Sequence, residues 1–139
     1  MVASFSASAT RGGSASGTLT INDNAGTQTI TLTGSGIAPV TLSRGTLNFG
    51  NVKVGRTSSA KTVTLTNHEK VSLSFSGIAT STGFAIAKDT CGTSIAAGAR
   101  CAVGVTFSPT ATGAATGTLT FTDDAGNSPQ IVSLKGTGY

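Results

Sequence analysis

Two cysteines, Cys91 and Cys101, are the residues best suited to covalent chemistry, and the 139-residue chain has no others. A zinc site would need further ligands, and the sole histidine, His68, is far from both cysteines in the sequence. A redox site would favour Cys-x-x-Cys spacing. The segment between the two cysteines is rich in glycine and alanine, which favours a disulfide closing a short connection, with two free thiols as the alternative. A disulfide would indicate an oxidising compartment.

A hydrolytic triad could be sought in His68, Glu69 and Ser72, which combine a base, an acid and a hydroxyl within five residues. No Gly-x-Ser-x-Gly elbow accompanies them, and no oxyanion-hole motif is recognisable. We therefore expect His68 to lie in an exposed turn. The sequence predicts no catalytic residue and no enzyme.

Asp23-Asn24 and Asp123-Asp124 occupy equivalent turns of the repeat, and paired acidic residues can bind Ca²⁺. A calcium site would need several more converging oxygen ligands, so turn formation is the simpler explanation. An isopeptide bond between a lysine and an Asp or Asn would have to use Glu69, the only glutamate, as its catalytic acid, and we do not expect one. No metal or other cofactor is predicted.

The net charge of +4 comes from basic residues scattered along the chain. Nucleic-acid binding needs clustered positive charge, so no such partner is predicted. No run approaches the ~20 apolar residues of a membrane helix, and we expect no membrane insertion. A carbohydrate-binding module of a secreted enzyme is the alternative function. Exposed aromatic residues are expected of such modules, but Tyr139 is the only Tyr, Trp is absent, and most of the six Phe fit core positions.

An internal repeat organises the chain. The segment Gly17–Gly26 (GTLTINDNAG) matches Gly117–Gly126 (GTLTFTDDAG), and both read as a strand followed by a turn. After the turn the match continues with a shift of two residues, so that Leu32, Gly34 and Gly36 correspond to Leu134, Gly136 and Gly138. The chain thus holds one complete unit and the tail of another.

Short alternating segments predict strands throughout the chain. Seven of them, with turn residues between them, fill residues 40–139 and predict an all-β, immunoglobulin-like sandwich whose first strand is broken at Arg44-Gly45. Only residues 94–98 could form a single helical turn. The predicted core residues are Val63, Leu65, Leu73, Phe84, Val103, Val105, Phe107, Leu119 and Phe121, and Val71 is expected to line the same strand as Leu73.

The domain boundaries follow from the repeat. Residues 1–36 read as the last three strands of a unit whose first part is missing, residues 37–39 as a linker, and residues 40–139 as the complete domain. Met1 precedes what looks like the interior of a strand, so we interpret it as an added start. Because the apolar face of residues 1–36 lacks its covering strands, we expect self-association, as a swapped dimer or an open fibre. The residues of this face are Phe5, Leu19, Ile21, Ile30 and Leu32.

Five strings of residues, in order along the chain, resemble a known family. They are Leu47–Gly55 (LNFGNVKVG), Thr62–Asn67 (TVTLTN), Thr90–Cys101 (TCGTSIAAGARC), Val105–Pro109 (VTFSP) and Gly117–Thr120 (GTLT). Together they resemble the bacterial branch of the Hydin-type or ASH immunoglobulin-like repeat domains, as in choice-of-anchor D proteins. The resemblance covers residues 40–139, and the tail of a second copy covers residues 1–36.

The resemblance implies a seven-stranded sandwich related to the PapD-like and major sperm protein folds. Bacterial members resemble secreted or surface-displayed repeat arrays, and eukaryotic relatives are cilium and centrosome scaffolds. The family offers no catalytic residues. The resemblance therefore implies a structural or interaction module that is secreted or displayed on the cell surface, with neighbouring repeats as partners. The turn Asn67–Lys70 is more charged than the family pattern.

Overall fold

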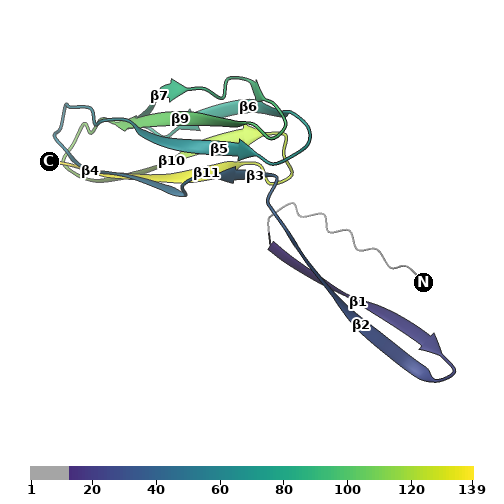
Figure 1. Ribbon diagram of the computed structural model, residues 1–139. Coiled ribbons are helices and arrows are strands. Elements are labelled where there is room, and N and C mark those ends of the chain that lie inside the picture. Colours follow the sequence, from purple (N-terminus) through teal and green to yellow (C-terminus); the bar gives the residue numbers. More distant parts are fainter. Residues whose placement is uncertain (1–12) are drawn as a thin grey trace.

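The computed structural model describes residues 13–139, and every regular element in this range is a β-strand (Figure 1). The strands are β1 (Gly13–Asp23), β2 (Gly26–Gly36), β3 (Val40–Leu42), β4 (Thr46–Val52), β5 (Lys61–Asn67), β6 (Leu73–Thr80), β7 (Phe84–Asp89), β8 (Ser94–Ile95), β9 (Arg100–Phe107), β10 (Gly113–Asp123) and β11 (Gln130–Gly138). The predicted all-β class is confirmed.

Strands β3 to β11 form two sheets that pack face to face (Figure 1). The strand order is β4-β11-β10-β6-β8 in one sheet and β3-β5-β9-β7 in the other. The pairs are antiparallel except for β4 and β11, which run parallel. Strands β3 and β4 belong to different sheets although only residues 43–45 separate them. The first strand of the domain is therefore interrupted at Arg44-Gly45, as the sequence predicts.

The core lies between the two sheets and is built from alternating side chains of both. Every predicted core residue is buried, and β11 adds Val132 and Leu134. The core includes a cluster of three phenylalanines, Phe49, Phe84 and Phe107, from three different strands. The rings of Phe84 and Phe107 stack with their centroids 4.9 Å apart. Phe107, which is 1% exposed, contacts both other rings and ties the two sheets together.

Two local predictions are wrong. Residues 94–98 do not form a helical turn, because Ser94–Ile95 is the short strand β8, which pairs with β6 and brings Ile95 beside Leu73. The buried side chain of Ile95 explains why the chain is extended here. Val71 does not line the core: it is 62% exposed and precedes the first residue of β6.

A buried polar residue, Asn67, fixes the turn between β5 and β6. Its side chain is 1% exposed, and its amide donates to the carbonyls of Val71 (2.9 Å) and Ala96 (3.2 Å). Its Oδ1 accepts from the N–H of Glu69 at 2.9 Å. Because buried polar groups must be paired, these bonds allow an amide inside the sandwich and tie the turn to the segment after β8.

The hairpin of β1 and β2 stands apart from the sandwich. The two strands pair antiparallel from Gly13↔Gly36 to Asp23↔Gly26, so their glycine-rich ends lie nearest the linker. Figure 1 shows the hairpin running out from the start of β3, away from both sheets. Neither sheet of the sandwich therefore covers a face of the hairpin.

Candidate interaction site

The exposed hairpin has the same strand register as β10–β11. In β1–β2 the facing pairs include Gly17↔Leu32 and Leu19↔Ile30. In β10–β11 the corresponding pairs are Gly117↔Leu134 and Leu119↔Val132. The correspondence runs the length of both hairpins, from Gly13↔Gly36 and Gly113↔Gly138 to Ile21↔Gln28 and Phe121↔Gln130. The repeat seen in the sequence is therefore also a repeat of structure.

The two hairpins differ in the solvent exposure of their apolar side chains. Directly opposite residues of an antiparallel pair lie on one face, so the repeat predicts that Leu19, Ile21, Ile30 and Leu32 share a face. Their counterparts in β10–β11 are between 0% and 1% exposed. Ile30 is 50% exposed, and the other three are half-buried. We call these four residues the apolar face of the hairpin. Phe5, the fifth residue predicted for this face, lies outside the described residues.

Glycines on the matching face of β10–β11 allow close contact with the opposite layer. A Cβ at Gly136 would lie 2.5 Å from Cε1 of Phe107, and one at Gly117 would lie 2.8 Å from Cβ of Ser81. A Cβ at Gly138 would overlap the carbonyl oxygen of Ala111. These glycines are needed because other parts of the sandwich press against them.

The hairpin keeps a glycine at each of these three places, namely Gly17, Gly34 and Gly36. In the sequence these glycines mark the repeat. Their packing role could not be predicted, because it depends on the Phe107 ring and the loop at Ala111, which are distant in sequence.

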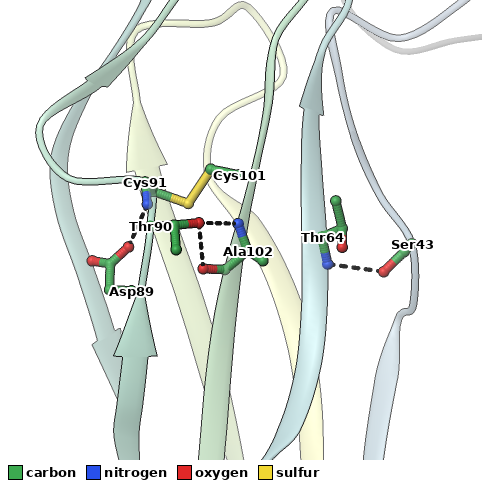
Figure 2. Close-up of a disulfide and its surroundings, with 7 residues drawn as sticks. All are labelled: Ser43, Thr64, Asp89, Thr90, Cys91, Cys101 and Ala102. Atoms are coloured by element: carbon green, nitrogen blue, oxygen red, sulfur yellow. Dashed lines mark hydrogen bonds between the residues drawn. A yellow bond between two sulfur atoms is a disulfide. The ribbon is translucent and has the colours of Figure 1, made fainter.

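The two cysteines form a disulfide between the end of β7 and the start of β9, with Cα atoms 4.9 Å apart (Figure 2). The Cys91 N–H donates to Oδ1 of Asp89 at 2.7 Å. Oγ1 of Thr90 accepts from the Ala102 N–H at 2.8 Å and donates to the Ala102 carbonyl at 3.1 Å. Both sulfur-bearing residues are buried, so the bond anchors the loop that carries β8.

Removing this disulfide should destabilise the sandwich. The sequence separation of the two cysteines is 10, and closing such a loop contributes about 2–3 kcal/mol in the chain-entropy treatment. We expect the Cys91→Ala/Cys101→Ala variant to lose that amount of unfolding free energy in urea titrations. Two thiols alkylated in the native chain without reductant would contradict the bond.

No hydrogen bond joins the side chains of His68, Glu69 and Ser72 in the described part of the chain. Nε2 of His68 is 2.8 Å from Oγ1 of Thr41, and the contact is exposed. The backbone N–H of Glu69 is held by Asn67. His68 thus lies in an exposed turn, as predicted. Within residues 13–139, no three His, Cys, Asp or Glu side chains gather closely enough to hold a metal ion, and no helix is long and apolar enough to cross a membrane.

Asp23 and Asp123 shape the turns of the two hairpins. Oδ1 of Asp23 accepts from the Ala25 N–H at 2.8 Å, and Oδ1 of Asp123 accepts from the Ala125 N–H at 3.0 Å. Asp124 reaches across to the backbone N–H of Ser74 at 2.9 Å. The two hairpins therefore share their turn chemistry as well as their register.

Asp123 differs from Asp23 because it is partly enclosed. Burial raises the pKa of the Asp123 carboxyl above its ordinary value of 3.8, against the lowering effect of hydrogen bonds from Ala125 and Ser128. Its Oδ2 is buried and has no hydrogen-bond partner in the described part of the chain. The ionised form of the Asp123 carboxyl is therefore less favourable in the folded state than in the unfolded state.

The Asp123→Asn variant should consequently be more stable than the parent at neutral pH. Asparagine keeps the oxygen that accepts from Ala125 but carries no charge to desolvate. For an acid with a raised folded pKa, stability falls as pH rises from about 3.8 through the folded pKa, so the gain should shrink on acidification to pH 3. Thermal unfolding between pH 3 and 7 tests this. Asp23→Asn, in the exposed turn, is the matched control and should change little.

Comparisons with known proteins agree with the sandwich. The family described as "Abnormal spindle-like microcephaly-assoc'd, ASPM-SPD-2-Hydin" (ASH) matches residues 37–131. Among solved structures, the "ASH / PapD-like domain of human CEP192 (PapD-like domain 7)" is similar with a TM-score of 0.59 and 14% identity, covering 73% of this chain and 85% of that one. No curated protein matches the sequence.

Two Vibrio cholerae proteins also contain a similar fold. The VesB protease gives a TM-score of 0.56 at 18% identity, and the match covers 71% of this chain but 32% of the protease. The "Secreted serine protease VesC" gives 0.51 at 18% identity, covering 66% and 21%. The chain thus spans less than a third of either protease, and the likeness concerns the fold alone. Since the family model matches more than half of the sequence, the chain belongs to the ASH (ASPM-SPD-2-Hydin) family.

Proposed function

We propose that this chain is a non-catalytic structural module of a secreted or cell-surface protein built from tandem repeats, and that it binds sandwiches of its own kind. One observation carries the proposal. The β1–β2 hairpin reproduces the pairing of β10–β11, yet its apolar face is open where that of β10–β11 is closed. A surface patterned for burial but left uncovered is a binding surface.

The same observation supports the division of the chain into residues 1–36, the end of a preceding repeat, a linker at 37–39, and a complete repeat at 40–139. A two-stranded hairpin is marginally stable in water, and stability requires further strands or a covering layer. Within residues 13–139 no other strand pairs with either outer edge of the hairpin, and such edges invite further strands. In a repeat array, the earlier strands of the preceding unit would cover the face and pair with both edges.

Secretion is supported by two observations. Disulfides persist in oxidising compartments, and Cys91–Cys101 is a buried disulfide. One of the structural neighbours is a secreted protease by its printed name. Within the ASH family, the string Thr90–Cys101 and the tandem arrangement favour the bacterial Hydin-type branch, as in choice-of-anchor D proteins.

The exposed side chains do not favour carbohydrate binding as a second function. Sugar-binding surfaces stack exposed aromatic rings against the ligand, and four of the described phenylalanines are buried. Phe75 is half-buried, which leaves Tyr139 as the exposed aromatic side chain within residues 16–139. No observation places it beside a second ring.

The test compares the full chain with a version that begins at residue 37, which keeps the Pro39 carbonyl bonded to the N–H of His68. Light scattering over a range of concentrations should show that the full chain associates and that the shorter chain is a monomer. A full chain that stays monomeric at every concentration would contradict self-association through the hairpin.

A further inference from the structure

The linker prevents the hairpin from taking the place of β10–β11 in its own sandwich. The start of β3 lies at the β10–β11 turn, because the Val40 carbonyl accepts from Nδ2 of Asn127 at 2.9 Å. Gly138 lies at the opposite end of β11, where it pairs with Val52. If β2 replaced β11, Gly36 would have to lie at the position of Gly138.

The linker is too short to let Gly36 reach the position of Gly138 in its own sandwich. Strand β11 runs from Gln130 to Gly138, and its nine residues are separated by eight rises of ~3.3 Å, which place its two end Cα atoms about 26 Å apart. The three residues between Gly36 and Val40 span at most about 14 Å when fully extended. The hairpin can therefore occupy a β10–β11 position only in another sandwich.

We propose that the β1–β2 hairpin is a donor that completes, in trans, a second sandwich of this kind whose own β10–β11 position is vacant. This inference rests on the proposed function and names its partner surface. We call that surface the acceptor seat: the inner face and the two strand edges, on β4 and β6, that β10–β11 occupies in the complete domain.

The glycines fit the seat position by position. By the shared register, Gly34 takes the place of Gly136 beneath the ring of Phe107. Gly36 takes the place of Gly138 beside the Ala111 carbonyl, and Gly17 that of Gly117 beside Ser81 and Phe84. A larger residue at any of these places would be excluded from the seat. All three glycines are on the hairpin, which extends away from both sheets of its own sandwich (Figure 1).

The apolar side chains fit as well, with one difference. Leu19 and Leu32 repeat the residues they would replace, and Ile30 replaces a valine. Ile21, however, is smaller than Phe121, which is 0% exposed in the complete domain. The hairpin therefore fills the seat less well than β10–β11 does, so it should replace an intact β10–β11 in only a small fraction of parent chains, and the parent should associate only at high concentration.

The strand edges supply main-chain pairing. In the complete domain β11 pairs parallel with β4, with Leu134 opposite Leu47. In the seat β2 would pair with β4 of the second copy in the same way, with Leu32 opposite Leu47. Such strand addition gains affinity from backbone hydrogen bonds and specificity from side-chain pockets. The donor and acceptor surfaces differ, so the association is head-to-tail and produces rings or open chains of subunits.

The experiment empties the seat with a single substitution in the full chain. A valine at position 136 would put its Cβ 2.5 Å from the Phe107 ring, so the Gly136→Val chain cannot seat its own β11 well. Hairpins of neighbouring copies, which carry Gly34, can still enter. We expect Gly136→Val chains to form oligomers whose melting temperature rises across a 100-fold range of concentration.

The control introduces the same glycine-to-valine change on the donor hairpin, at Gly34. The Gly34→Val/Gly136→Val chain has neither a fitting hairpin nor a fitting β11, and it should be unfolded at all concentrations. Gly34→Val alone should melt like the parent. If Gly136→Val and the double variant melt alike, the seat does not accept the hairpin, and the inference is wrong.

If the Gly136→Val chain folds only in part, an interchain disulfide provides a second test of the seat. By the register of β11 on β4, Ser35 should lie opposite Asn51 of the second copy. Oxidation of Gly136→Val chains that also carry Ser35→Cys and Asn51→Cys should give an interchain link between these positions, read by peptide mass. Its absence at high concentration would count against the seat. The parent chain could associate while the melting and trapping experiments give no sign of the seat. The hairpin would then bind by another surface, so this inference would be wrong while the proposed function would stand.

Discussion

Replacing Phe107 with alanine should lower the free energy of unfolding by about 3–5 kcal/mol, the usual cost of deleting a large buried aromatic ring. Phe107 is 1% exposed and contacts the rings of Phe49 and Phe84 from the opposite sheet and its own. Its ring also covers Gly136, which has no side chain to fill the space that would be left. A cavity at the centre of the sandwich should remain because neither neighbour can collapse into it.

Urea titration of the parent and variant chains measures this loss. Phe75→Ala is the matched control, since it deletes the same ring from a half-buried position and should cost clearly less. Equal losses for the two variants would mean that the three-ring cluster does not concentrate the stability of the core.

Asn67→Ala should cost about 2–4 kcal/mol, although it removes only a small polar group. The substitution leaves the carbonyls of Val71 and Ala96 and the N–H of Glu69, all three bonded in part-buried contacts, without their partner. Each buried group left unpaired costs about 1–3 kcal/mol, and partial access of water to the turn reduces the sum.

The control for Asn67 is Asn48→Ala. Oδ1 of Asn48 also accepts from a backbone N–H two residues on, that of Gly50 at 3.0 Å, but the contact is exposed. Water replaces that bond, so a loss of about 0.5–1.5 kcal/mol at most is expected. If both variants unfold at the same urea concentration, burial of the Asn67 amide does not stabilise the turn.

The sandwich could be predicted because alternation is a local signal. Along β5 and β9, buried residues such as Val63 and Val103 recur at every second position, and this period alone assigns them to the core face. The repeat also identified the hairpin, since matching glycines and leucines must occupy matching places in the ladder.

Other features depend on residues distant in sequence and could not be predicted. Strand β8 has two residues, too few for any period to be visible, and it is extended because Ile95 meets Leu73. The role of Asn67 depends on a carbonyl at Ala96, far along the chain. The hairpin also depends on contacts between residues distant in sequence. Its sequence predicts an apolar face, but the shape of the seat is defined by how β10–β11 packs in the sandwich.

The parallel pairing of β4 with β11 has a mechanical consequence. Thr46 pairs with Ser133 and Val52 with Gly138, so the entry to β4 and the exit from β11 lie at opposite ends of the pair. Tension applied between residues 40 and 139 acts along both strands and loads their hydrogen bonds in shear, so that they must break together. A fibre of such units would resist stretching, and the unfolding rate under load, rather than the equilibrium stability, would determine how long each unit survives.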